Sequence, residues 1–280
     1  MAVSTTTTLD DLISPMVAEA LFVASETTIM RGLVKNYTMP MNSGKVLQVP
    51  IYPTKLADVL TEATDISTPE TLSTTKADLT VQEAGMLITV TDFARDTSES
   101  NVIQDVGRIL GEALAKRVDR SLTALFSGFS TSVGNDGTDL TVATLQSAAT
   151  KLKAAGVPGP FVGVFNPEAT HAMKATLTNS FADPNAGILQ NEAMREGYVG
   201  RIAGIDIFET SNVNEDSATA TSGAVFSRDA LGLAMMKDIA IEQQRDASLR
   251  ATELVGTMTF AAGELHDSYG VEVKSSNSGF

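Results

Sequence analysis

Two histidines and no cysteines limit the side-chain chemistry open to this chain of 280 residues. His171 falls in a stretch expected to form a helix after Pro167, and no G-x-S-x-G motif accompanies it as a nucleophile. His266 stands beside Asp267, a pair that could contribute to a metal site. It has no second histidine or ligand-spaced carboxylate pair nearby. We therefore expect neither histidine to be catalytic or to bind a metal.

Glycine-rich and acidic motifs are also better explained by structure than by catalysis. The segment 197–204 (GYVGRIAG) lacks the Lys-Ser/Thr of a phosphate-binding loop, so turns between strands explain its glycines. The pairs Asp10–Asp11 and Glu215–Asp216 lie in polar stretches typical of solvated loops. Met235–Met236 suits packing within a strand. The sequence predicts no catalytic residue, no cofactor site and no metal site, and hence a protein that is not an enzyme.

Composition and charge indicate a globular chain with an acidic surface. Hydrophobic residues make up 43% of the chain, charged residues 19%, and the net charge is -14. This charge disfavours a protein that coats nucleic acid, since coating needs basic surface to displace counterions. An acidic inner wall could still enclose nucleic acid without adhering to it. No apolar run approaches the roughly 20 residues that cross a bilayer, and no signal peptide is present, so we expect a cytoplasmic protein without membrane contact.

The stretch 101–127 is predicted to form one long amphipathic helix, because its apolar residues recur every three or four positions. Asn101 is expected to cap its start, and Gly128 to end it in a left-handed conformation. Gly107 and Gly111 weaken the helix by up to about 1 kcal/mol each, so we expect another element to pack closely over them. The apolar positions are Val102, Ile103, Val106, Ile109, Leu110, Ala113, Leu114, Val118, Leu122, Leu125 and Phe126.

Two predicted strands, 45–53 and 79–94, flank a polar segment of more than 20 residues and so form a long projecting hairpin. A compact monomer seldom keeps such a loop unless the loop has a function. The lack of regular βαβ alternation argues against a doubly wound nucleotide-binding fold. Further expected elements are a short helix around Val17–Ala24, helices at 141–155, 168–177 and 187–195, and strands at 161–167 and within 197–213, 223–246 and 253–274.

In this order, the segments resemble the major capsid protein of tailed bacteriophages, the Hong Kong 97 fold that is shared with encapsulins. The hairpin 45–94 resembles the extended E-loop of that family. The stretch 101–127, ending in LTALFSGFS, resembles the spine helix of the peripheral domain. Residues 161–177 (FVGVFNPEATHAMKATL) are similar to the strand, Asn-Pro turn and helix of the axial domain.

Three later segments extend the resemblance toward the end of the chain. GRIAGIDIFETSNV at 200–213 resembles the next axial segment, and 225–246 together with YGVEVK at 269–274 resemble the strands that return to the peripheral domain. The resemblance implies an α+β fold of the Hong Kong 97 type. Its implied parts are an N-terminal arm at 1–44, the E-loop at 45–95, the peripheral domain with its spine helix at 96–140, the axial domain at 141–222, and returning strands at 223–280.

The resemblance implies a structural function in a virion capsid. Copies of the chain would form the pentamers and hexamers of an icosahedral shell, which is assembled in the host cytoplasm and encloses double-stranded DNA without sequence-specific binding. Scaffolding, portal and decoration proteins are candidate partners, and no cofactor is implied. Some members cross-link subunits through a lysine–asparagine bond, but no motif selects a pair here, so a non-covalent hairpin is expected.

Candidate contacts and hinges follow from the same resemblance. Inter-subunit contacts are expected from charged residues of the hairpin, and a hinge is expected from glycines that follow the spine helix. The candidate contact residues are Lys55, Glu62, Asp65, Glu70 and Lys76, and the candidate hinge residues are Gly128, Gly134 and Gly137.

Three alternatives remain open from the sequence. The first is an encapsulin-type shell that holds a cargo enzyme, for which a shorter hairpin and a more helical N-terminus are expected. The second is a soluble enzyme, which the missing histidine or metal cluster disfavours. The third is a tail-tube or fibre protein, which would assemble into helical tubes.

Overall fold

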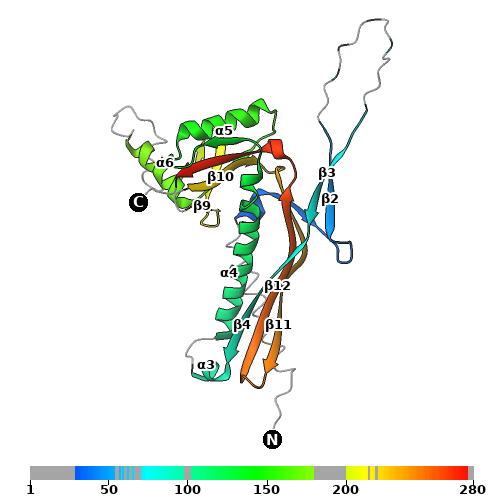
Figure 1. Cartoon of the computed structure of the whole chain (residues 1–280), viewed down its shortest axis with the longest axis vertical. Coiled ribbons are helices and arrows are strands. Elements are labelled where there is room, and N and C mark those ends of the chain that lie inside the picture. Colours follow the sequence, from blue (N-terminus) through cyan, green and yellow to red (C-terminus); the bar gives the residue numbers. More distant parts are fainter. Residues whose placement is uncertain are drawn as a thin grey trace.

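The long amphipathic helix lies at the centre of an elongated molecule (Figure 1). It is α4, Val102–Thr123, and its 22 residues span about 33 Å. The computed structural model describes residues 29–53, 71–97, 102–179, 200–213, 215–217 and 220–276, with the single positions 57, 59, 62 and 65. The expected helices at 17–24 and 187–195 and the cap Asn101 lie outside these residues.

A four-stranded sheet runs alongside α4 for its whole length (Figure 1). Its order is β1-β11-β12-β4, with β1 parallel to β11 and the other pairs antiparallel. The short helix α2 precedes β1, and α3 follows β4 at the far end of the sheet. The bounds are α2 Met30–Leu33, β1 Lys35–Thr38, β4 Gln82–Thr91, α3 Asp92–Thr97, β11 Leu231–Asp246 and β12 Ala251–Glu264.

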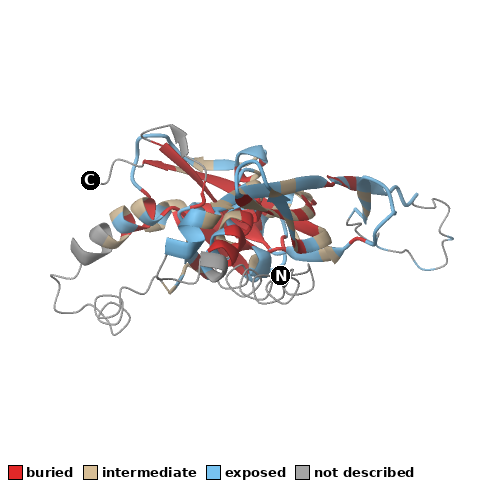
Figure 2. Ribbon diagram, turned by 90° about the horizontal axis from the view of Figure 1, so that it is seen from below, coloured by how far each residue is buried: buried red, intermediate tan, exposed pale blue. Residues whose placement is uncertain are grey.

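The apolar stripe of α4 forms the main core against this sheet, as Figure 2 shows by the buried residues between them. Leu110 packs over Gly256 of β12, where an added Cβ would lie 3.3 Å from Leu110 Cδ2. Ile109 departs from the predicted stripe and is 48% exposed. The stripe residues in the core are Val106, Leu110, Leu114, Val118, Leu122 and Phe126.

The predicted left-handed end of the helix at Gly128 is wrong. The helix ends at Thr123, and a 3-10 turn at Phe126–Gly128 follows it. Gly128 does not have a positive φ. Phe126 is instead drawn into the core, where its ring centroid lies 5.7 Å from that of Phe226. Because of this tertiary contact, the chain forms a tight 3-10 turn at the position where local sequence rules predict a left-handed glycine.

The predicted hairpin exists as a two-stranded ribbon that projects beyond the body (Figure 1). It pairs β2, Val46–Ile51, with β3, Thr75–Thr80, in antiparallel register. The expected strand 79–94 is only partly correct: β3 already begins at Thr75, and residues 92–94 belong to α3. Between β3 and β4, the N–H of Val81 donates to the carbonyl of Lys45 at 2.8 Å. The chain therefore leaves the ribbon there and enters the long sheet as β4.

One face of the described ribbon packs on the body. It contacts β11 and β12, and Leu79 is fully buried. Gly263 of β12 allows this approach, because an added Cβ would lie 2.5 Å from Leu79 Cδ2. The other residues of this cluster are Met39, Ala77, Val81, Ala234, Ala261 and Leu265.

A second, mixed sheet with two helices forms the other end of the molecule (Figure 1). Its order is β5-β13-β10-β6-β8-β7, and β9 pairs with β10. Because β6 and β8 are parallel and joined through α6, the fold holds one βαβ unit among its antiparallel pairs. Bounds are β5 Ser132–Gly134, α5 Val142–Ala154, β6 Phe161–Phe165, α6 Pro167–Asn179, β7 Arg201–Ile202, β8 Ile205–Glu209, β9 Glu215–Ser217, β10 Ala220–Ser227 and β13 Gly270–Ser276.

Local caps begin both helices of this second unit where the sequence predicted helices. Thr141 Oγ1 accepts the N–H of Thr144 at 3.2 Å at the start of α5. Asn166 Oδ1 accepts the N–H of Glu168 at 3.0 Å at the start of α6. A core of buried residues from α5, α6, β6, β8, β10 and β13 holds the unit together.

Candidate functional site

The two histidines lie on different elements, His171 on α6 and His266 between β12 and β13. His171 is exposed on α6. The ring of His266 stacks on Tyr269, with centroids 4.5 Å apart and planes at 18°. Partial burial lowers the pKa of His266 below its usual value. The adjacent Asp267 accepts hydrogen bonds from the N–H and hydroxyl of Ser130 and thereby joins the segment after α4 to the start of β13.

The other motifs singled out in the sequence occupy structural positions. Gly204, with φ of 85°, forms the turn between β7 and β8. Glu215–Asp216 lies on β9 and Met235–Met236 on β11, whereas Asp10–Asp11 lies outside the described residues. Within the described part of the chain, no three His, Cys, Asp or Glu side chains come together in a metal-binding group. No helix in that part is long and apolar enough to cross a membrane.

Of the predicted contact residues, Lys76 lies on the ribbon, and Glu62 and Asp65 fall in the segment that connects its two strands. Lys76 is exposed on β3, and its Nζ lies 3.9 Å from Asp78 Oδ1. Glu62 and Asp65 are exposed, and Lys55 and Glu70 lie outside the described residues. Large apolar side chains are also exposed along this part of the chain: Tyr52 is 61%, Val59 98% and Leu72 68% exposed. The ribbon thus carries both charge and apolar area away from the body.

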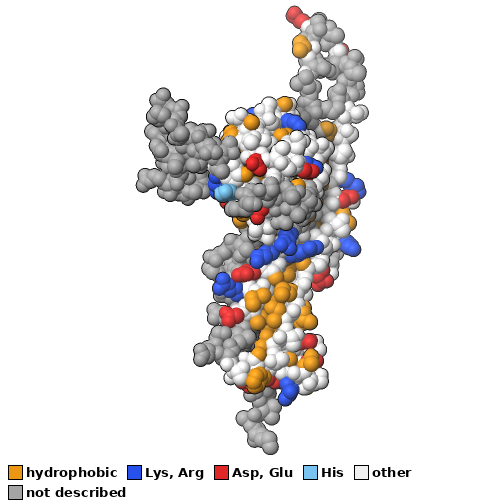
Figure 3. Space-filling model, turned by 60° about the vertical axis from the view of Figure 1, so that its left-hand side comes forward, with side chains coloured by type: hydrophobic (Ala, Val, Ile, Leu, Met, Phe, Trp, Pro, Cys, Tyr) orange, Lys and Arg blue, Asp and Glu red, His pale blue; other side chains and the backbone are white. Residues whose placement is uncertain are grey.

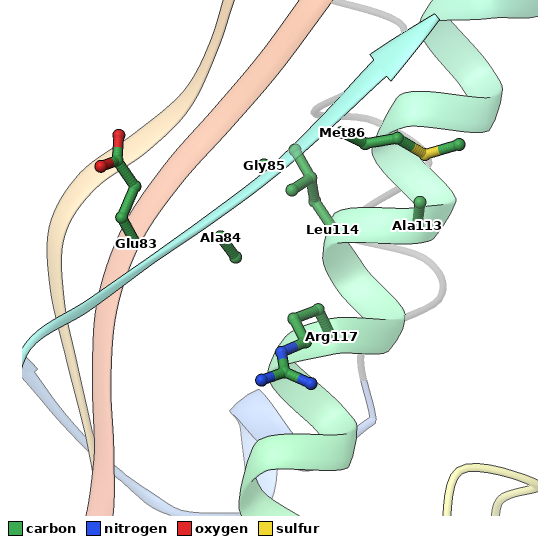
Figure 4. A pocket seen from close by; sticks show the side chains of 7 residues that line it. All are labelled: Glu83, Ala84, Gly85, Met86, Ala113, Leu114 and Arg117. Atoms are coloured by element: carbon green, nitrogen blue, oxygen red, sulfur yellow. The ribbon is translucent and has the colours of Figure 1, made fainter.

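A second apolar surface lies on the elongated part of the molecule, where hydrophobic side chains gather in a vertical band (Figure 3). It includes a groove of about 430 Å³ between α4 and β4. In Figure 4, Met86 of β4 reaches toward Ala113 of α4, and Arg117 borders the same space. Met86 is 38% exposed and Leu87, also on β4, is 54% exposed. The groove is lined by Glu83, Ala84, Gly85, Met86, Ala113, Leu114 and Arg117.

The three candidate hinge glycines have different surroundings. Gly134 has φ of 84° and lies in the β5–β13 pair, where an added Cβ would collide with the Lys274 carbonyl. Gly137 has φ of 81° and open space around it. Gly128 has no positive φ, and an added Cβ would lie 3.5 Å from Glu264 Oε2. Of the three, only Gly137 combines a positive φ with open space around its Cα.

Asp119 is a buried carboxylate that sequence reasoning missed. Its side chain on α4 is 0% exposed, and its Oδ2 accepts the N–H of Ile29 at 3.3 Å. Its Oδ1 has no hydrogen-bond partner of ordinary geometry among the described residues. Burial raises its pKa to about 6, although the N–H groups of Ile29 and Met30 and the Asn212 side chain oppose the rise. The sequence does contain one signal for its burial: Asp119 lies four residues after Ala115, on the same side of the helix as Gly107 and Gly111.

Comparison with known proteins identifies the family to which this chain belongs. A family model described as phage capsid protein matches residues 74–273, more than two thirds of the chain. The chain belongs to the phage capsid protein family. This confirms the sequence-based prediction of a structural major capsid protein and does not favour the encapsulin-type shell. No curated protein matches the chain.

Solved capsid structures share the fold of this capsid protein. The capsid of cyanophage P-SCSP1u matches with a TM-score of 0.67 and 19% identity, over 88% of this chain and 87% of that one. The acid-stable capsid of Helicobacter pylori bacteriophage KHP30 matches with a TM-score of 0.69 and 10% identity, over 90% and 92%. The structure from Gordonia phage Cozz matches with a TM-score of 0.69 and 15% identity, over 89% of this chain and 86% of that one. The predicted α+β capsid fold is confirmed, and self-association into a virion shell follows from membership of the family.

Proposed function

We propose that copies of this capsid protein form the pentamers and hexamers of an icosahedral shell around double-stranded DNA. The supporting observation is the ribbon β2–β3, which projects beyond the body and packs on β11 and β12 through one face (Figure 1). In this proposal 1–44 is the N-terminal arm, 45–95 the E-loop, 96–140 the peripheral domain, 141–222 the axial domain and 223–280 the returning strands.

Exposed apolar area on the segment that connects β2 and β3 supplies the driving force for assembly. Tyr52, Val59 and Leu72 gain little from the chain's own core, because each is more than half exposed. Covering apolar surface stabilises an interface by roughly 25 cal/mol per Å². Many weak contacts of this kind, repeated around each subunit, add up to a durable shell. Heterologous contacts that close on themselves produce rings.

The charged residues of the ribbon are proposed to align neighbouring subunits without covalent bonds. Lys55, Glu62, Asp65, Glu70 and Lys76 carry both signs of charge, and complementary charges favour the correct register between partners. If the contacts are non-covalent, particles boiled in detergent release only chains of monomer mass. A ladder of multiples on the denaturing gel would show cross-linking instead.

The net charge of -14 supports enclosure of DNA without sequence-specific contacts. A negative inner wall repels phosphate groups, so a packed genome is held by the closed shell and does not adhere to it. Assembly in the host cytoplasm, and help from separate scaffolding, portal and decoration proteins, are part of the proposal. Catalysis plays no part in it.

The glycines after α4 are proposed to let one sequence occupy both ring types. Gly137 combines a positive φ with open space, whereas Gly134 is restricted by the Lys274 backbone and Gly128 has neither a positive φ nor a close contact. Backbone angles at these positions, compared between pentameric and hexameric copies in an assembled particle, test the proposal. Identical angles in every copy would contradict it.

Electron microscopy of the expressed protein tests the assembly proposal. We expect closed shells from the native chain, and dispersed but folded subunits from a variant that combines Tyr52→Asp with Leu72→Asp. Gln146→Asp, at an exposed position of α5, is the matched control and should still assemble. Helical tubes would favour a tail protein, and a lone compact particle under every condition would favour a soluble enzyme. Normal shells from the double variant would remove the ribbon from the mechanism.

A further inference from the structure

The chain crosses between its two sheets three times, and the three crossings are bound to one another. The first runs from α4 to β5, the second from β10 to β11 and the third from β12 to β13. The Ala230 carbonyl, in the second crossing, accepts the N–H groups of Leu265 and His266, in the third, at 2.8 and 3.2 Å. Asp267 Oδ1, in the third crossing, accepts the N–H of Ser130, in the first, at 2.7 Å. We call these three bound crossings the junction.

Glu264, the last residue of β12, faces the junction. Its Oε2 lies 3.5 Å from the position of an added Cβ at Gly128, so the carboxyl group points toward the turn after α4. Its neighbours Gly263 and Leu265 contact other residues, on the side of the ribbon. A hydrogen bond links the carboxyl groups of Glu264 and Asp267. Because an ionised carboxylate can only accept, this bond requires a proton on one of the two.

We propose that Glu264 and Asp267 form a pH-dependent latch, which fastens the turn after α4 to the third crossing in acid and loosens when both groups are ionised. In the closed state, protonated Glu264 donates to Asp267, and Asp267 accepts from the N–H and the hydroxyl of Ser130. Loss of the proton to solvent leaves two negative charges beside the turn, and their repulsion favours the open state. Solvent reaches the pair, since Glu264 is partly exposed and Asp267 is exposed.

The energetics of Glu264 set the direction of the response. Burial, and after it the charge of Asp267, raises the pKa of Glu264 above its usual 4.5. Because the closed state binds this proton more tightly, the contribution of the latch is full below pH 4.5 and is lost as the pH rises through the raised pKa. A shift of one pKa unit corresponds to a tenfold change in an equilibrium, so we expect a change of up to about tenfold between the closed and open populations.

Two elements beside Glu264 bring no charge to it. Its register partner on β11 is Leu231, and residues 124–131 after α4 include no charged side chain. The interaction of Glu264 with Asp267 is therefore not offset from these two elements.

The other charged groups at the junction have interactions of their own. Lys35 Nζ on β1 lies 2.9 Å from Asp229 Oδ1, and Arg228 Nε donates to a backbone carbonyl at 3.3 Å. The pKa of His266 is lowered below 6.5 by burial, and that of Asp119 is raised to about 6. These last two groups are the competing sources of a pH response, and the experiment must distinguish them from Glu264.

The absence of native cysteine permits a direct test in the full chain. Ser127→Cys places a single spin label at an exposed position of the turn after α4, and Gln146→Cys places one on the exposed side of α5. In dispersed subunits we expect the label at position 127 to become more mobile as the pH rises from 5 to 8, a range above the isoelectric point of about 4.5. The ratio of mobile to immobile label should change by up to about tenfold. The label at position 146 should not respond.

Substitutions assign the response to the carboxyl pair. Glu264→Gln keeps a donor for Asp267 without the charge, so the turn should stay immobile at both pH values. Glu253→Gln lies on the same strand away from the junction, and this matched control should leave the response intact. Ser130→Ala removes one of the two hydrogen bonds to Asp267 and should raise the mobility at pH 5.

Hydrogen exchange of the chain without any substitution gives an independent measurement. The protection factor of the Ser130 N–H, corrected for the intrinsic exchange rate at each pH, should fall between pH 5 and pH 8. Unchanged mobility and protection across this range would overturn the inference. A response that persists in Glu264→Gln would assign it to His266 or Asp119 and would overturn the inference as well. Both measurements use dispersed subunits, so their outcome does not depend on the assembly proposal.

Discussion

Asp92 and Arg245 form a two-point ion pair at the far end of the long sheet. Arg245 Nη1 lies 2.8 Å from Asp92 Oδ1, and Nη2 lies 2.6 Å from Oδ2. Arg245 lies on β11 and Asp92 is the first residue of α3, directly after β4; β12 separates β11 from β4. The pair therefore crosses the middle strand and joins its two neighbours.

The first prediction concerns this pair. Arg245→Lys keeps the charge but loses the two-point geometry, so we expect a small loss of thermal stability at neutral pH. The arginine lowers the pKa of Asp92 below its usual 3.8. The stabilising contribution of the ion pair is thus present above pH 3.8 and is lost as the pH falls through the lower pKa that Asp92 has in the folded state. A double-mutant cycle with Asp92→Asn, measured by thermal unfolding at pH 7 and at pH 2, checks this; an unchanged coupling at low pH would contradict it.

The second prediction concerns Asp119, whose pKa is raised from 3.8 to about 6. Because the folded state binds this proton more tightly than the unfolded state, the contribution to stability is full below pH 4 and is lost as pH rises through 6. Asp119→Asn keeps the acceptor for Ile29 without the buried charge. We expect it to raise the free energy of unfolding by about 1–3 kcal/mol at pH 7.5 and to have little effect near pH 4. Denaturant titrations at both pH values check this, and a less stable variant at pH 7.5 would show that the charge is compensated.

The third prediction concerns the aromatic contact between the turn after α4 and β10. Phe126 and Phe226 are fully buried, with ring centroids 5.7 Å apart. Phe126→Ala removes a large side chain from the core and should cost about 3–5 kcal/mol of unfolding free energy. Phe93→Ala is the control, since Phe93 is 79% exposed, and it should change stability by less than about 0.5 kcal/mol. Chemical denaturation of dispersed subunits measures both.

The fourth prediction orders the three candidate hinge glycines. Gly137→Ala should cost about 1–2 kcal/mol, because its positive φ disfavours a side chain while the space around it is open. Gly134→Ala should cost more, since the methyl group would also collide with Lys274. Gly128→Ala should be nearly neutral. Thermal unfolding of the three variants under one condition gives the order, and an equal cost at all three would show that local backbone geometry does not decide it.

Local sequence was sufficient to predict most helices and strands. The helix α4 was located by its apolar spacing, and α5 by the same spacing and the polar residue Thr141 at its start. Apolar spacing and a helix cap each involve residues that are close in sequence, so their effect on the backbone does not depend on distant parts of the chain. The ordered set of such segments also sufficed for the resemblance to capsid proteins, which the family match confirms.

Only the tertiary structure decided which charged residues are buried or paired. Asp119 meets Ile29 across 90 residues of sequence, and Asp92 meets Arg245 across 153. The end of α4 at Thr123 likewise depends on Phe126, in the following turn, packing against Phe226 of β10. Side-chain spacing in the sequence predicts which face of an element is apolar, but contacts between distant segments determine what covers that face. The burial of Asp119 and the partners of α4 are consequences of those distant contacts.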